Sequence, residues 1–184
     1  MSGIITDNLG RSSGLVKSAG GGGTILKVKS VKFTGTASET GEAPSQLSDF
    51  DMSFAPTTSD GKLYFEAHVV CGTGGTTSVG LYFYDVTNTT IIGAYADAAS
   101  SRLRLSWRTA NHADAAAVTA SFGTWHEPGS TDSRDYTIFG NANYDTTLYI
   151  NRALGNDDNA TINNSNASST FTITEYAASA VTLT

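Results

Sequence analysis

Short segments in which apolar and polar residues alternate recur along most of this chain. Residues 63–70 show the pattern most clearly, because one set of alternate positions is wholly apolar: Leu63, Phe65, Ala67 and Val69. Successive side chains of a β-strand point to opposite faces, so a period of two predicts strands with one buried face. A chain dominated by this pattern is restricted to folds built from packed sheets.

We expect about ten short strands separated by turns rich in Gly, Asn, Asp and Ser. They are predicted within residues 26–33, 50–54, 63–70, 79–83, 90–95, 102–108, 118–122, 136–139, 148–150 and 171–175. A bulge is expected near Ser30, and Asp60-Gly61 is expected to form a tight turn. Residues 113–117 are too short for a stable helix, and no repeat of fixed period is present. The predicted fold class is all-β, a jelly-roll-like antiparallel β-sandwich.

Composition excludes several classes of function. The chain has 184 residues, of which 15% are charged, below the roughly 25% usual in globular domains. Thr (26), Ser (21) and Gly (19) are abundant, and the formal net charge is −6. Nucleic-acid binders are normally basic, so we expect no nucleic-acid partner. No apolar run approaches the roughly 18 residues of a membrane span, and the N-terminus lacks a secretory-signal pattern, so no membrane partner is expected.

Four consecutive glycines, residues 20–23, divide the chain into two parts. Glycine loses the most backbone entropy on ordering, so this run favours a linker over a regular element. We therefore predict an N-terminal arm and linker over residues 1–24 and a sandwich domain over residues 25–184. Residues 1–32 contain five basic residues and one acid, a charge of 5 − 1 = +4, which leaves −10 for the rest.

The arm carries apolar and basic side chains but has too little chain around them to form its own core. Such residues are often buried against a neighbour, so we expect the arm to attach to another subunit or to a larger particle. The residues expected to make this contact are Ile4, Ile5, Leu9, Arg11, Leu15, Val16 and Lys17.

No catalytic, cofactor or metal site is predicted, and the chain is not expected to be an enzyme. The single cysteine, Cys71, excludes an intrachain disulfide, and its apolar neighbours favour a small buried side chain. The sequence contains neither a nucleophile elbow nor a glycine-rich phosphate loop with its Lys-Ser/Thr. The three histidines lack the spacing of zinc ligands: His68, His112 and His126. Glu66 and His68 share a strand face, which favours a surface ion pair.

Two acidic features leave alternatives open. The loop Asn156-Asp157-Asp158-Asn159 offers the oxygen ligands that calcium prefers but lacks the spacing of a calcium loop, so a tight hairpin turn is the default interpretation. A depolymerase would need two carboxylates across a cleft. The sequence does not place any two of the candidates together: Asp85, Asp97, Glu127, Asp132 and Asp135.

Three aromatic residues near predicted strand ends are candidates for glycan binding: Tyr95, Trp125 and Tyr144. Aromatic faces on loops can stack against sugar rings, which would make the domain lectin-like. The simpler alternative is that each ring packs over the end of the sandwich. Four Asn-x-Ser/Thr sites are also present, but they imply glycosylation only in a secreted eukaryotic protein.

The order of several motifs resembles a family of bacteriophage virion proteins, particularly those of marine phages. The opening Gly3-Ile4-Ile5-Thr6-Asp7-Asn8-Leu9-Gly10-Arg11 is similar to the leader of many such proteins. The body is similar to jelly-roll domains of their tail fibres and related surface proteins. The stretches that carry this similarity are Asp97-Ala98-Ala99-Ser100-Ser101-Arg102, Pro128-Gly129-Ser130-Thr131, Tyr149-Ile150-Asn151-Arg152 with Asp157-Asp158, and residues 169–175.

The resemblance implies a non-enzymatic structural role on the exterior of a virion. Domains of this family usually assemble as homotrimers, with an N-terminal segment attached to other virion proteins of the capsid or tail. The chain would then be a capsid decoration protein or a tail fibre or spike accessory. The alternative is a receptor-binding tip that recognises host surface glycans. Cyclic symmetry would also cover exposed sheet edges, in agreement with the strand-rich sequence.

Overall fold

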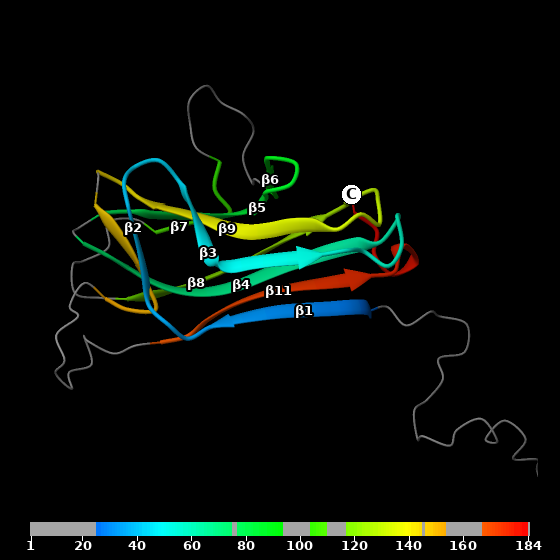
Figure 1. Cartoon of the computed structure of the whole chain (residues 1–184), viewed down its shortest axis with the longest axis horizontal. Coiled ribbons are helices and arrows are strands. Elements are labelled where there is room, and N and C mark those ends of the chain that lie inside the picture. Colours follow the sequence, from blue (N-terminus) through cyan, green and yellow to red (C-terminus); the bar gives the residue numbers. More distant parts are fainter. Residues whose placement is uncertain are drawn as a thin grey trace, which may run out of the picture.

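The computed structural model describes residues 25–74, 77–93, 104–109, 117–144, 146–153 and 167–183. Two antiparallel sheets pack face to face as a sandwich (Figure 1). The predicted fold class, an all-β, jelly-roll-like antiparallel sandwich, is confirmed. The one helical element among the described residues is a 3-10 turn, η3 (Ala178–Ala180). The predicted arm, residues 1–24, lies outside the described residues.

The first sheet has the strand order β1-β11-β4-β10-β2, and β8 also pairs with β4. Its strands are β1 (Ile25–Phe33), β2 (Ala37–Thr40), β4 (Lys62–Thr73), β8 (Val118–His126), β10 (Thr147–Ile150) and β11 (Ser169–Tyr176). β1 pairs only with β11 among the described strands, so it forms an edge of this sheet.

The second sheet has the strand order β3-β9-β5-β6, and the short β7 also pairs with β5. Its strands are β3 (Ser45–Phe54), β5 (Val79–Asp85), β6 (Thr90–Ile92), β7 (Trp107–Arg108) and β9 (Arg134–Ala142). A register shift between Leu47 and Met52 bulges β3 against β9.

Alternating residues of the two sheets form one core between them. The apolar set predicted on residues 63–70 is fully buried, whereas its alternate neighbours are exposed or half-buried. Phe65 lies at the centre, with its ring centroid 5.1 Å from that of Tyr136 and 5.6 Å from that of Phe83. Burial of large aromatic and branched side chains on both inner faces supplies the main stabilisation of such a sandwich.

Three details differ from the sequence-based expectation. Strand β2 was not predicted, because its four residues are too few to show a period. The register shift of β1 lies between Ile25 and Lys27 and not near Ser30, which pairs regularly with Thr172. The strand predicted over residues 102–108 is reduced to the two residues of β7 within the part of that segment that is described.

The motif Tyr149-Ile150-Asn151-Arg152 has a structural explanation. The Asn151 backbone has a φ of 61°, a left-handed conformation that asparagine tolerates better than most residues. Its Nδ2 donates to the carbonyls of Phe33 (3.0 Å) and Gly35 (2.8 Å), and its Oδ1 accepts from Ser169 Oγ at 2.5 Å. Its N–H donates to the Val70 carbonyl at 2.8 Å. This buried amide therefore ties together β1, β4, β10 and β11.

The sandwich has two ends that differ in what they carry. Ile25, Tyr176 and Lys62 lie in register at one end, which we call the arm end because residue 25 directly follows the arm. The C-terminus lies at the same end (Figure 1). At the other end, the distal end, Thr73 pairs with Leu148 in the first sheet. Strand β4 has 12 residues and rises about 3.3 Å per residue, so the two ends are about 35 Å apart.

Candidate functional site

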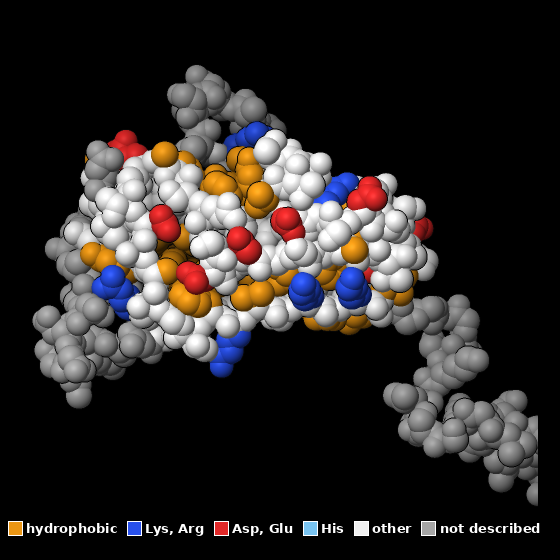
Figure 2. Space-filling model, viewed as in Figure 1, with side chains coloured by type: hydrophobic (Ala, Val, Ile, Leu, Met, Phe, Trp, Pro, Cys, Tyr) orange, Lys and Arg blue, Asp and Glu red, His pale blue; other side chains and the backbone are white. Residues whose placement is uncertain are grey.

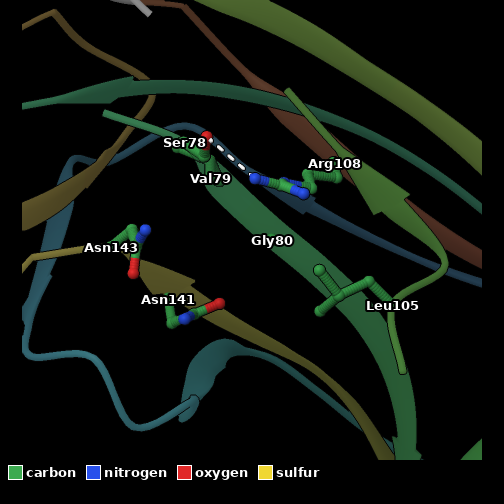
Figure 3. A pocket seen from close by; sticks show the side chains of 7 residues that line it. All are labelled: Ser78, Val79, Gly80, Leu105, Arg108, Asn141 and Asn143. Atoms are coloured by element: carbon green, nitrogen blue, oxygen red, sulfur yellow. Dashed lines mark hydrogen bonds between the residues drawn. The ribbon is translucent and has the colours of Figure 1, made fainter. Parts of the chain in front are cut away.

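A pocket of about 320 Å³ lies at the distal end between β5, β7 and β9 (Figure 3). The start of β5 and the residue before it form one side, and the other sides are formed by β7 with the segment before it and by the end of β9 with the residue after it. The lining residues are Ser78, Val79, Gly80, Leu105, Arg108, Asn141 and Asn143. Among the described residues, the lining therefore contains one cation, two amides and one hydroxyl, but no carboxylate.

Gly80 allows the pocket floor to form. A Cβ at this position would lie 2.7 Å from Leu105 Cδ1 and 2.8 Å from Asn141 Oδ1. The Leu105 and Asn141 side chains approach the bare backbone of β5 at Gly80 from its two sides, as Figure 3 shows. A larger residue would force one of these two side chains away.

The Asn141 side chain is 9% exposed, and its two polar atoms differ in their contacts. The Nδ2 group donates to the Glu42 carbonyl at 2.9 Å, which fixes the orientation of the amide. The Oδ1 atom is buried and accepts no hydrogen bond from the residues that the structure describes. Buried carbonyl oxygens are nearly always paired, so this acceptor is set to receive a donor from outside the described chain.

Arg108 supplies the positive charge of the pocket. Its guanidinium lies at hydrogen-bond distance, 3.5 Å, from Ser78 Oγ, and points along the pocket wall in Figure 3. Among the described carboxylates, none lies within ion-pair distance of it. A guanidinium presents five N–H donors in a planar fork that matches a carboxylate.

Tyr144, one of the three predicted glycan-binding residues, directly follows the pocket residue Asn143. It is 73% exposed, and its φ of 59° places a bulky residue in the left-handed region. The Glu42 carboxylate accepts its N–H at 3.1 Å, which holds this turn. Strain of this kind in a non-glycine residue is typical of functional positions, although the strain alone does not identify one.

Trp125, the second predicted glycan-binding residue, lies at the arm end on the outer face of the first sheet. Its ring packs between Tyr64 (centroids 4.9 Å apart) and Tyr176 (5.2 Å). Gly123 makes room for this cluster, because a Cβ there would lie 2.4 Å from the Tyr64 hydroxyl. Trp125 and Tyr144 are therefore at opposite ends of the sandwich. The third candidate, Tyr95, lies outside the described residues.

The arm end also exposes apolar side chains on β1. Five large hydrophobic residues are exposed in the described part of the chain, and three of them belong to β1: Ile25 (54%), Leu26 (40%) and Val28 (56%). Two lysines of the same strand reach across the open side of the sandwich to β3. Lys27 Nζ donates to the Ala55 carbonyl at 2.7 Å and Lys29 Nζ to the Ser53 carbonyl at 2.8 Å. Figure 2 shows a band of hydrophobic side chains along this side, with Lys and Arg side chains over it.

The predicted arm contacts lie outside the described residues, so the structure says nothing of their environment. These are Ile4, Ile5, Leu9, Arg11, Leu15, Val16 and Lys17. His112, Asp97 and the loop Asn156-Asp157-Asp158-Asn159 also lie outside them. The part of the chain that the structure describes contains no group of three or more His, Cys, Asp or Glu side chains arranged for a metal ion. It also contains no helix that is long and apolar enough to cross a membrane.

Four other potentially reactive side chains of the described chain are buried or are paired with neighbouring groups. Cys71 is buried, and burial raises the pKa of its thiol to about 12, which makes it a poor nucleophile. Glu66 and His68 lie 3.4 Å apart on the surface, as predicted. Glu175 is fully buried and accepts from Thr57 N–H (2.7 Å) and Thr57 Oγ1 (2.8 Å), and from Thr58 N–H.

The depolymerase candidates differ in burial. Asp85 is 1% exposed, and it accepts from Asn88 N–H at 2.9 Å and lies 3.5 Å from Arg134. Glu127 pairs with Lys62 at 2.5 Å, and its side chain is 54% exposed. Asp135 accepts from the Ser53 hydroxyl.

Sequence reasoning missed the pocket. Its residues come from three separated segments, and none of them forms a local motif. Asn141 and Arg108 carry no unusual sequence signal, since polar residues are common at strand ends. The sequence hint was the isolated Gly80 between two apolar residues of a strand, because glycine inside a strand often marks a close approach of other groups.

No protein-family model matches the chain, and no curated protein matches it. Among solved structures it is similar to a mutant VP2 protein of infectious bursal disease virus in derived T=1 particles, with 13% identity over 81% of this chain and a TM-score of 0.39. It is also similar to the structure of the Gx strain of that virus (12% identity, 83% of this chain, TM-score 0.35). A third similar structure is the VP2 subviral particle (11%, 82%, TM-score 0.36). The chain spans 36–38% of the length of these viral chains.

Proposed function

We propose that this chain is a non-enzymatic structural protein of a bacteriophage virion. In this proposal it forms a homotrimer of jelly rolls on the exterior of the particle, as a capsid decoration protein or a tail fibre or spike accessory. Residues 1–24 anchor it to other virion proteins. The resemblance of the leader and body motifs to phage virion proteins supports this role, and so does the Thr- and Ser-rich sequence with few charged residues.

The observation that carries the proposal is the exposed apolar edge of β1. Solitary edge strands are normally protected by charge, bulges or a covering segment, because an unpaired edge promotes association. β1 protects only its inner side, where Lys27 and Lys29 reach β3, while Leu26 and Val28 remain exposed. An edge of this kind, located where the arm begins, supports burial against a neighbouring subunit.

The arrangement of the two ends supports an anchored and displayed domain. The arm joins the sandwich at the end that carries the apolar edge and the C-terminus (Figure 1). The distal end, about 35 Å away, carries the polar pocket and the exposed Tyr144. A protein attached through its arm would therefore present the pocket outward.

Deletion of residues 2–24 tests the anchor. Particles are assembled with tagged full-length chain or with the deletion variant, and the occupancy of each on purified particles is measured by quantitative mass spectrometry. We expect the deletion variant to fold and to be absent from particles. A paired comparison separates the two kinds of contact: I4S/I5S removes apolar side chains, and R11Q/K17Q removes charge. Full occupancy by the deletion variant would contradict the proposal.

A second candidate function is a lectin-like, receptor-binding tip that recognises glycans of the host surface. The specific observation in its favour is the polar pocket at the distal end beside the exposed Tyr144. A glycan array probed with the multimeric full-length chain tests it directly. Signals that disappear in Tyr144→Ala would support it, and an array without any signal at high protein concentration would contradict it.

A further inference from the structure

We infer that the pocket between β5, β7 and β9 binds a carboxylate-bearing saccharide, with Arg108 holding the carboxylate and Asn141 accepting a hydroxyl. This inference rests on the second candidate function, because it names the class of glycan and the residues that select it. It is independent of the particle role.

The charge of the pocket selects an acid. Arg108 is the one charged residue among the described residues of the lining, and the chain as a whole carries a net charge of −6. A guanidinium without a carboxylate partner in its surroundings pairs strongly with an incoming carboxylate, since two parallel N–H donors meet its two oxygens. Ser78 Oγ, 3.5 Å from the guanidinium, supports its position at the wall of the pocket.

The Oδ1 atom of Asn141, which has no partner among the described residues, favours a ligand that carries a hydrogen-bond donor in addition to its carboxylate. Its amide cannot turn around to satisfy itself, because Nδ2 is already bound to the Glu42 carbonyl at 2.9 Å. An ionised carboxylate alone has no donor to offer this oxygen. A sugar hydroxyl both donates and accepts, and the Asn143 amide and the Ser78 hydroxyl can share the remaining hydroxyls. The combination of an acid and several hydroxyl groups describes an acidic saccharide.

The size and the apolar part of the pocket fit one sugar residue. A volume of about 320 Å³ lies at the lower end of small-molecule sites, which cover roughly 300–1,000 Å³. Leu105 and Val79 contribute apolar surface beside the polar groups, as the C–H face of a sugar ring requires. Leu105 lies next to the Asn141 oxygen above Gly80, so a bound hydroxyl reaches this oxygen when the Leu105 side chain changes its rotamer.

The experiment is a titration of the isotope-labelled full-length chain, followed by NMR of the side-chain amides of Asn141 and Asn143. The ligands are methyl β-glucuronide and methyl β-glucoside, which differ only in carboxylate against hydroxymethyl, and inorganic phosphate as a plain anion. We expect the glucuronide to shift both amides and the glucoside to bind at least about tenfold more weakly. Arg108→Gln is expected to remove this preference, whereas Arg104→Gln, the matched loss of an exposed arginine outside the lining, leaves it unchanged. The exposed position of Arg108 predicts normal folding of the variant, which thermal unfolding verifies.

Each contrary outcome identifies what fails. Equal binding of glucoside and glucuronide, also in Arg108→Gln, would overturn the acid selectivity and leave the lectin-like function standing. Shifts of the same amides by phosphate with equal affinity would overturn the saccharide and leave only an anion site. No shift by either sugar, together with an empty glycan array, would overturn both this inference and the second candidate function.

Discussion

The two ends of the sandwich use their side chains in opposite ways. At the arm end, the buried carboxylates have partners: Glu175 accepts three hydrogen bonds and Asp85 lies beside Arg134. The surface there is apolar along β1. At the distal end, the buried Asn141 has an oxygen without a partner among the described residues, and the exposed Arg108 contacts Ser78 but no described carboxylate.

His126 Nε2 at the arm end is also buried without a hydrogen-bond partner among the described residues, but Asn141 differs from it because Asn141 lines the pocket. A buried polar group with all its partners contributes to the free energy of unfolding. A buried polar group without a partner lowers the free energy of unfolding. When such a group lies beside a pocket, a ligand bound there can supply the missing hydrogen bond. The contrast makes four predictions, which we give in order of decreasing effect.

The largest effect is expected for Glu175→Ala at the arm end. Removing the carboxylate of the fully buried Glu175 breaks its three charge-assisted hydrogen bonds from Thr57 and Thr58, which should lower the free energy of unfolding by about 3 kcal/mol. Asn141→Ala, the counterpart at the distal end, removes one hydrogen bond and an unpaired oxygen and should cost about 1 kcal/mol. Urea titration measures both values. Equal losses would show that Asn141 stabilises the fold as much as Glu175 does.

The second effect concerns association through β1. Val28→Lys places a charge on the exposed apolar edge and should raise the dissociation constant of the oligomer at least about tenfold, which corresponds to about 1.4 kcal/mol. The control is Ser38→Lys on β2, at the other edge of the same sheet. Analytical ultracentrifugation gives the constants. Equal weakening by both variants, or by neither, would place the interface elsewhere.

The third effect is a pH dependence located at the arm end. Burial lowers the pKa of His126 below its ordinary value of 6.5; the charge of Arg134 lowers it further, and Asp85 and Glu127 oppose this shift. The folded protein therefore favours the neutral ring, and the unfolded chain binds more protons below pH 6.5. Stability should be complete above that pH and fall as the pH decreases toward the folded pKa, by at most about 1.4 kcal/mol per pH unit.

His126→Gln removes this titration while the carboxylates remain. Denaturant unfolding of parent and variant between pH 7.5 and pH 5 isolates the histidine as the difference between two curves. We expect the parent to lose more stability than the variant over this interval. Parallel curves would contradict the neutral, buried state of His126.

The smallest effect compares two turns with left-handed residues. Tyr144 (φ 59°) lies at the distal end, and Thr89 (φ 51°) lies in the turn between β5 and β6. Asparagine tolerates this conformation, so Tyr144→Asn and Thr89→Asn should each raise the free energy of unfolding by about 0.5–1 kcal/mol. Only Tyr144→Asn should weaken the binding of methyl β-glucuronide. If Tyr144→Asn raises the free energy of unfolding but leaves the binding of methyl β-glucuronide unchanged, Tyr144 is not part of the binding site.

Much of the fold could be predicted from the sequence, because a strand with one buried face has apolar residues at every second position. The inward residues Leu63, Phe65 and Ala67 and the alternating Phe50, Met52 and Phe54 are buried as predicted. Strand β2 could not be predicted, since its four residues are held by pairing with β10 and not by a hydrophobic pattern of their own. The position of the β1 bulge depends on its register with β11, which no local pattern encodes.

The candidate site could be predicted only in fragments. Tyr144 was recognised as an exposed aromatic residue, but its neighbours in the pocket come from β5, β7 and β9, whose juxtaposition requires the sheet order. Trp125 carried the same sequence signal as Tyr144, yet it packs between Tyr64 and Tyr176 at the other end. An aromatic residue near a strand end therefore marks a rim position, and the surrounding polar groups decide whether the position can bind a ligand.

The central claim, that the domain is anchored by its arm end and displays its distal end, can be tested by maleimide labelling of intact particles. Cys71 is buried, with its pKa raised to about 12, so it stays unreactive and single cysteines can be added elsewhere. Particles carrying Tyr144→Cys should label completely, whereas those carrying Val28→Cys should label only after the particles are dissociated under conditions that leave the domain folded and Cys71 buried. Protection of Tyr144→Cys together with free labelling of Val28→Cys would contradict the account.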